Sequence, residues 1–168
     1  MTTKDYMIKW AVYALALLPL CVADQLILGR FSPFGVAPLL FPLAAVAVGM
    51  MEGGFAGSIY GLATGVVWWL GGAGAPAILL LTLAGLLAGA IAQNGLSVNL
   101  ISNLLVSALL LLVGDGLRVL LYLAQGIAPL PALLQVAVPE IVCSLVFAIP
   151  VYLLYRTVWR RVGGTRLA

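Results

Sequence analysis

Hydrophobic residues follow one another in long runs along this chain, and polar residues interrupt the runs only briefly. Apolar and polar positions do not alternate with a period of two, so a β-barrel is disfavoured. Several runs approach the roughly 20 apolar residues that a helix needs to cross a bilayer, and clusters of glycine, proline or asparagine separate them. The pattern predicts an all-α integral membrane protein with six transmembrane helices, at about residues 6–28, 35–51, 55–70, 76–92, 97–123 and 131–158.

The composition indicates that lipid, and not water, is the solvent of this chain. Hydrophobic residues make up 64% of the sequence and charged residues 8%, and the mean hydropathy is +1.21. A soluble domain of this size carries about 25% charged residues. The length of 168 residues suits one domain, so we expect a single transmembrane domain over residues 1–168.

Basic residues gather at the two ends of the chain. Lys4 and Lys9 lie at the start, and four arginines lie near the end, three of them in residues 159–168, which form a predicted basic tail. An even number of helices places both ends on one side of the membrane, and their positive charge places that side in the cytoplasm. A short basic tail suits an anionic leaflet, whereas a nucleic-acid partner, which we do not expect, would require a larger basic surface.

Prolines and one glutamate add detail to this topology. Pro38 and Pro42 predict that the second helix is kinked or partly unwound near its start, and Pro139 and Pro150 predict interruptions of the last helix. Glu52 lies in the very short connection between the second and third helices. We expect its carboxylate to be solvated at the inner surface, as most charged side chains are.

Glycines recur every four residues in the third helix, and the fourth helix repeats the spacing. Small residues let two backbones approach closely, which matters because lipid provides no hydrophobic drive for helix association. The stripe therefore predicts a closely packed third helix, whose neighbour is either another helix of the bundle or a helix of a partner protein. The glycines concerned are Gly53, Gly57, Gly61, Gly65, Gly85 and Gly89.

Three charged residues of the last two helices are predicted to meet in the outer half of the membrane. Asp115 and Arg118 are three residues apart, hence on one helix face, and Glu140 is expected at a similar depth in the last helix. An isolated charge is costly in hydrocarbon, so the three are expected to pair. Two interpretations stay open: an ion-pair cluster that locks the helices together, or a polar site that receives a partner or a lipid head group.

The sequence offers little for catalysis. It contains no histidine, the commonest general base and transition-metal ligand, and no nucleophile elbow, zinc-protease motif, phosphate loop or CxxC pair. Cys21 and Cys143 both lie in apolar runs and are expected to be free thiols. We therefore expect neither an enzyme nor a bound cofactor or metal.

Two segments of the chain resemble one protein family. Residues 52–62 read Glu-Gly-Gly-Phe-Ala-Gly-Ser-Ile-Tyr-Gly-Leu, and residues 149–156 read Ile-Pro-Val-Tyr-Leu-Leu-Tyr-Arg, with further basic residues after them. A glycine-rich third helix that opens on a small acidic turn, together with a last helix of this type, resembles the rod shape-determining protein MreD family. The resemblance covers most of the chain in length and layout.

The resemblance implies a noncatalytic scaffold in the cytoplasmic membrane of a bacterium, where it would support rod shape and lateral peptidoglycan synthesis by the cell-wall elongation complex. The implied partners are an MreC-like coiled-coil membrane protein, a RodA-type glycosyltransferase, a class B penicillin-binding transpeptidase and the actin-like MreB filament. The glycine stripe and the outer charge cluster would be contact surfaces for such partners.

An alternative function comes from another class of protein. MreD-like proteins are similar in architecture to the substrate-binding S components of energy-coupling factor transporters, which are also small six-helix proteins with cytoplasmic ends. Such a protein would bind a vitamin or a metal in an outward-facing pocket, and a bound ligand would raise its thermal stability. The polar groups of that pocket would come from Asp115, Arg118, Gln125, Gln135 and Glu140.

Replacement of Arg118 by alanine tests the predicted charge cluster. The change leaves two carboxylates without a cation in hydrocarbon, so the amount of protein in membranes is expected to fall sharply. Arg30→Ala, in the predicted outer loop, is expected to have little effect. Quantitative immunoblotting of membrane fractions measures both variants, and wild-type levels of both would contradict the cluster.

Overall fold

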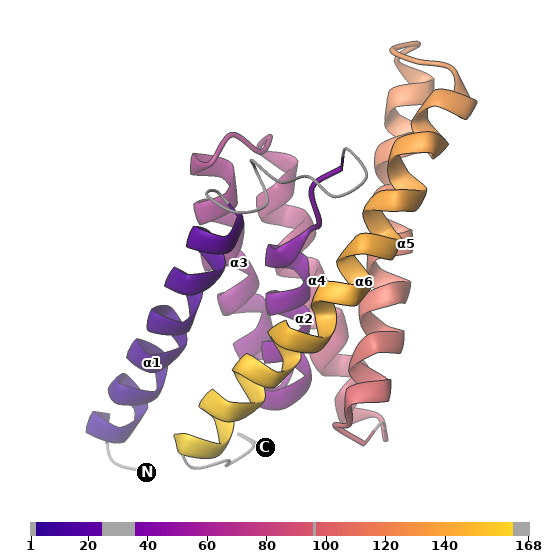
Figure 1. Ribbon diagram of the computed structural model, residues 1–168. Helices are drawn as coiled ribbons and strands as arrows, with labels where there is room; N and C mark the ends of the chain where they lie inside the picture. The colour runs from indigo at the N-terminus through magenta and orange to yellow at the C-terminus, as the bar shows by residue number, and fades with distance from the viewer. Residues whose placement is uncertain (1–2, 25–35, 96, 163–168) are drawn as a thin grey trace.

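The computed structural model describes residues 3–24, 36–95 and 97–162, and these residues form six helices (Figure 1). Within these ranges the chain is all-α, as predicted. The stretch 25–35, which includes the predicted end of the first helix and Arg30, lies outside the described residues. The helices are α1 (Thr3–Val22), α2 (Leu40–Glu52), α3 (Gly54–Leu70), α4 (Pro76–Gln93), α5 (Leu100–Ala124) and α6 (Leu130–Arg161).

Three of the helices, α4, α5 and α6, are long and apolar enough to cross a membrane. Shorter apolar helices lie at Met7–Val22, Leu40–Glu52 and Gly54–Leu70. These features indicate a membrane protein, and a crossing by all six helices stays a prediction. The start of α1 and the end of α6 lie at the same end of the bundle (Figure 1).

The structure moves the predicted starts of two helices. α2 begins at Leu40 and not at residue 35, because Pro38 disfavours helical geometry in the residue before it. α5 begins at Leu100 and not at residue 97, since the Asn99 side chain donates a 3.0 Å hydrogen bond to Ser97 Oγ and the Asn99 backbone is extended. Local bonds of this kind compete with helix formation.

Helix α6 is continuous, which corrects the predicted interruptions at Pro139 and Pro150. Both prolines lie inside one helix of 32 residues. Transmembrane helices tolerate proline because neighbouring groups satisfy the backbone carbonyl that loses its N–H donor. The helix ends at Arg161 and not at residue 158, so the first residues of the predicted tail are helical, and arginines in the last turn favour this end of a helix.

The backbones of α2, α3 and α4 touch, and we call these three helices the frame. A Cβ atom added at Gly57 or Gly85 would overlap the backbone of the other residue, and one at Gly61 or Gly65 would overlap the backbone of α4. A Cβ atom at Gly89 would overlap the start of α3. The glycines of the predicted stripe thus pack α3 on α4 within this chain, and a partner helix cannot occupy the same positions.

Two glycines of the frame have roles that the predicted stripe does not suggest. Gly53 has a φ of 100°, a region that favours glycine, and it connects α2 to α3 as a single-residue turn. Gly49 of α2 lies against Gly57 and Gly85: a Cβ atom at Gly49 would overlap the backbone of α4, and a Cβ atom at Gly57 of α3 would overlap Gly49. The four-residue spacing of glycines therefore begins one helix earlier than predicted, and Gly49 joins all three helices of the frame.

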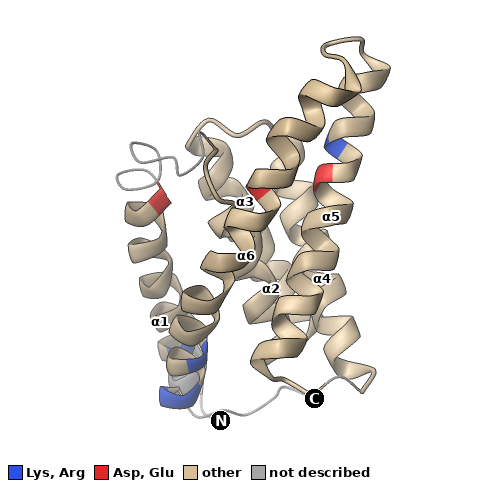
Figure 2. Ribbon diagram, turned by 45° about the vertical axis from the view of Figure 1, so that its right-hand side comes forward, with Lys and Arg blue, Asp and Glu red and all other residues tan. Residues whose placement is uncertain are grey.

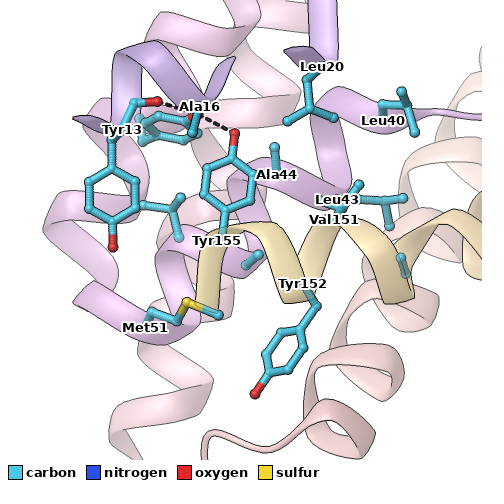
Figure 3. Packing of buried hydrophobic residues seen from close by; sticks show 14 of the residues in the cluster. Tyr13, Ala16, Leu20, Leu40, Leu43, Ala44, Met51, Val151, Tyr152 and Tyr155 are labelled. Carbon is cyan, nitrogen blue, oxygen red and sulfur yellow. Dashed lines mark hydrogen bonds between the residues drawn. The ribbon is translucent and has the colours of Figure 1, made fainter. Parts of the chain in front are cut away.

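Helices α1 and α6 pack on the frame through a hydrophobic cluster (Figure 3). Tyr13 of α1, Leu43 of α2 and Tyr155 of α6 are no more than 1% exposed. The rings of Tyr13 and Tyr155 are stacked, with their centroids 6.2 Å apart. This cluster brings the first and last helices of the chain to one side of α2.

The hairpin of α5 and α6 extends beyond the other helices at one end of the molecule (Figure 1). α5 has 25 residues and α6 has 32, whereas α4 has 18 and α3 has 17. We call residues 119–138 the α5–α6 extension. Most of its exposed large side chains are apolar or aromatic: Leu120, Leu121, Tyr122, Leu123, Ile127, Leu130, Leu134, Val136 and Val138.

Gly85→Ala is expected to destabilise the protein, because the added Cβ atom meets the backbone of α3 and not a side chain that could move aside. Overpacking of this kind costs about 1–3 kcal/mol. Gly116→Ala is the matched control: a Cβ atom there has nothing within 4 Å. In a helix, alanine is better than glycine by up to about 1 kcal/mol. Thermal unfolding in detergent measures both variants, and equal midpoints would contradict the close packing of α3 and α4.

Candidate functional site

Two buried clusters of charged side chains lie at different heights in the bundle. One joins α1 to α2 near the end where α1 begins and α6 ends, and the other joins α5 to α6 at the base of the α5–α6 extension (Figure 2). The second cluster contains the three residues that were predicted to meet.

The first cluster is an ion pair between Lys9 and Glu52. The Lys9 Nζ atom lies 2.5 Å from Glu52 Oε2, and both side chains are no more than 2% exposed. Tyr13, one turn after Lys9, donates a 2.7 Å hydrogen bond to Glu52 Oε1. The expectation of a solvated Glu52 is therefore wrong. Its carboxylate is buried because a full positive charge and a hydroxyl donor compensate for the lost water.

Tyrosines extend the first cluster to two more helices. The hydroxyl groups of Tyr60 on α3 and Tyr155 on α6 lie 2.5 Å apart in a hydrogen bond, and Tyr60 also donates to the Tyr13 carbonyl at 3.5 Å (Figure 3). The charged and hydroxyl groups are thus paired with one another. Together they tie α1, α2, α3 and α6 at one end of the bundle.

The second cluster consists of Asp115, Arg118 and Glu140. The Arg118 guanidinium lies 3.0 Å from Asp115 Oδ1 and contacts both oxygens of the Glu140 carboxylate across the helix interface. Both carboxylate side chains are less than 10% exposed, whereas the Arg118 side chain is 36% exposed. One guanidinium thus stands between two carboxylates, so the cluster carries one net negative charge when both are ionised.

Ser144 connects the second cluster to the frame. Its hydroxyl donates a 2.6 Å hydrogen bond to the Glu140 carbonyl, one turn earlier on α6, and accepts a 2.8 Å bond from the backbone N–H of Leu39. Leu39 immediately precedes α2. The position of Glu140 is therefore fixed from two sides, by Arg118 on α5 and by the start of α2.

A pocket of about 70 Å³ lies beside this cluster, between α2, α3, α4 and α5. Its walls are mainly apolar, and its polar groups come from Ser107, Asp115 and Arg118. Ser107 Oγ and Asp115 Oδ2 are buried without a hydrogen-bond partner in the described part of the chain, as is Asn103 Oδ1. The spacing of these three residues places them on one face of α5, which is turned towards the interior.

The chemistry that the two clusters offer is charge pairing and hydrogen bonding. Within residues 3–24, 36–95 and 97–162, no three His, Cys, Asp or Glu side chains gather in an arrangement that could hold a metal ion. Cys21 and Cys143 are free thiols, as predicted. The groups brought together are a guanidinium, an ammonium, carboxylates and hydroxyls.

Two parts of these sites were not predicted from the sequence. Lys9 and Glu52 are 43 positions apart, and each has an ordinary explanation alone, as a basic start of the chain and as a turn residue. The sequence spacing could have predicted the inward polar face of α5. Ser107 follows Asn103 by four residues and precedes Asp115 by eight, which keeps all three on one helix face.

Glu52→Gln tests the buried ion pair. The neutral amide leaves the Lys9 ammonium buried without a counter-charge, and breaking a buried pair in this way costs about 3–5 kcal/mol. Lys9→Met in the same chain removes the unpaired charge and is expected to recover much of the loss. The free energy of unfolding in detergent, measured for the two single variants and the double variant, gives the coupling energy between Lys9 and Glu52.

Arg160→Gln is the control for this cycle, because Arg160 is exposed near the end of α6 and its replacement should leave the stability unchanged. Additive effects of the Lys9 and Glu52 replacements would contradict a direct ion pair.

Comparison of the chain with protein-family models, with curated protein sequences and with solved structures gives no significant match.

Proposed function

We propose that this protein is a noncatalytic scaffold of the bacterial cell-wall elongation complex, of the type that the MreD family represents. In this proposal all six helices cross the cytoplasmic membrane, and both ends of the chain lie in the cytoplasm. The direct partner would be an MreC-like, single-span, coiled-coil protein. A RodA-type glycosyltransferase, a class B transpeptidase and MreB filaments would belong to the wider complex.

The observation that carries the proposal is the α5–α6 extension. It projects beyond the frame (Figure 1), and large apolar side chains such as Leu120 and Ile127 are more than 60% exposed on it. Large exposed apolar surfaces mark sites of contact with proteins or membranes. A partner helix could contact the extension without displacing any part of the bundle, while the Arg118 cluster holds its base in place.

The contact between the two segments that resemble MreD also supports the proposal. Residues 52–62 and 149–156 are far apart in the sequence, and the hydrogen bond between Tyr60 and Tyr155 joins them. Within the first segment, Glu52 forms the buried ion pair and Gly57 packs on α4. The residues that carry the resemblance therefore share one structural task, which is to hold the bundle together away from the extension.

The alternative of a vitamin-binding S component receives less support from the geometry. The pocket beside Asp115 has a volume of about 70 Å³. Pockets for ligands of that size usually measure about 300–1,000 Å³. Gln125 and Gln135, which were expected to contribute polar groups, are exposed on the extension and do not line the pocket. The scaffold is therefore the function that the structure supports better.

A photo-crosslinking amino acid at Leu120 tests the proposal. This side chain is 63% exposed on the extension, so a partner that docks there should become covalently attached on irradiation of living cells. We expect an adduct whose mass and peptides identify a single-span coiled-coil membrane protein. Depletion of the scaffold should also turn rod-shaped cells round.

Leu79 on α4 is the matched control position, because it is apolar and 66% exposed but lies on the frame. The same crosslinker at Leu79 should give adducts with lipid only. Two outcomes would contradict the extension as the docking surface. One is equal amounts of protein adduct at Leu120 and Leu79, and the other is no adduct at Leu120 in cells that make both the scaffold and its coiled-coil partner.

A further inference from the structure

The pocket beside Asp115 contains buried acceptor atoms that the described residues do not satisfy. Asp115 is 5% exposed and Ser107 is 0% exposed. The second carboxylate oxygen of Asp115 and the hydroxyl of Ser107 both lack a hydrogen-bond partner among these residues, and both residues line the pocket. A buried acceptor without a donor costs free energy, so such atoms in native proteins usually meet water, an ion or a ligand.

The charge of the second cluster indicates which kind of ligand fits. Asp115 and Glu140 share one guanidinium, which contacts only one oxygen of Asp115. The residues that α2, α3 and α4 contribute to the pocket are all uncharged, and Lys9, the buried cation of the other cluster, is paired with Glu52. One positive charge at the free Asp115 oxygen would therefore neutralise the cluster in its apolar surroundings.

The size of the pocket limits this charge to a small ion. A cavity of about 10–15 Å³ is enough to hold one water molecule. The pocket offers about 70 Å³, so it has room for an ion with a few waters and not for an organic cation with a bulky head group. The Arg118 side chain, which lines the pocket and is 36% exposed, connects it to the surface.

We propose that Asp115 Oδ2 binds one small monovalent positive charge, supplied by Na⁺ or by a proton, and that waters in the pocket link it to Ser107. With this charge bound the cluster is neutral, and without it the two carboxylates repel each other at the base of the α5–α6 extension. Binding therefore strengthens the attachment of α5 to α6 and to the frame. This site is independent of the proposed scaffold function.

The thermal unfolding midpoint of the purified protein in a neutral detergent tests this site. In each titration Na⁺ replaces choline in steps at constant ionic strength, and the titration is repeated at several pH values. A ligand that binds only the folded protein raises the midpoint as its concentration increases. Choline carries the same charge but is too large for the pocket, so the midpoint should rise with Na⁺, or with falling pH, and not with choline.

Asp115→Asn removes the charged acceptor and keeps the shape of the side chain. It should weaken the apparent affinity for the ion by about tenfold or more, because a charged acceptor forms much stronger bonds than a neutral one. Gly114→Val is a second variant, which fills the pocket. A Cβ atom at Gly114 would lie 3.5 Å from the Leu80 side chain, an ordinary contact, so this variant is expected to fold. Gly116→Val is its control, since Gly116 faces open space.

A response to Na⁺ that both pocket variants lose and Gly116→Val keeps would identify a sodium site. A response to pH alone that Asp115→Asn loses would identify a proton site at Asp115, because a proton on the carboxylate needs no space in the pocket and Gly114→Val would keep that response. The proposal is overturned if the wild-type midpoint responds to neither, if the response to Na⁺ survives in Gly114→Val, or if a response to pH alone survives in Asp115→Asn. For Na⁺, the comparison of the two valine variants decides even if Asp115→Asn does not fold. For a proton, Asp115→Ala is the second variant that removes the carboxyl group.

Discussion

Direct contact between the backbones of α2, α3 and α4 is the constraint on which the rest of the structure depends. Lipid gives helices no hydrophobic reason to associate, so close packing and interhelical hydrogen bonds must hold them together. Gly49, Gly57 and Gly85 meet at one point where no side chain could fit. α1 attaches to this frame through the ion pair with Glu52, and α6 attaches through the hydrogen bond with Tyr60. α5 packs against α6 and α2.

Both clusters bury charged side chains in apolar surroundings, but they compensate for the lost water in different ways. At the first, Lys9, Glu52 and Tyr13 satisfy one another and are fully enclosed, which suits a fixed structural contact. At the second, Arg118 is shared by two carboxylates and is partly exposed, and one oxygen of Asp115 keeps its capacity to bind. The second cluster lies at the base of the α5–α6 extension, so a change of its charge would act on the surface that we propose as a docking site.

Local periodicity in the sequence was enough to predict six helices and the glycine face of α3, but not the inward polar face of α5. The contacts of Arg118 with Asp115 and Glu140 follow from helical spacing and from the cost of isolated charges in lipid. The identity of neighbouring helices does not follow, because each glycine face could meet any helix. For the same reason the pairing of Lys9 with Glu52 was missed. The predicted interruptions at Pro139 and Pro150 were wrong because a helix in an apolar bundle tolerates proline where its surroundings satisfy the freed carbonyl, and the sequence does not show those surroundings.

Native-state hydrogen exchange of the protein in detergent, followed helix by helix in increasing denaturant, tests the common frame most directly. If glycine-mediated contact unites α2, α3 and α4, their amides should exchange together at the highest free energy, after α1 has opened. Exchange of α3 independently of α4, or of both before α1, would contradict a frame on which the other helices depend.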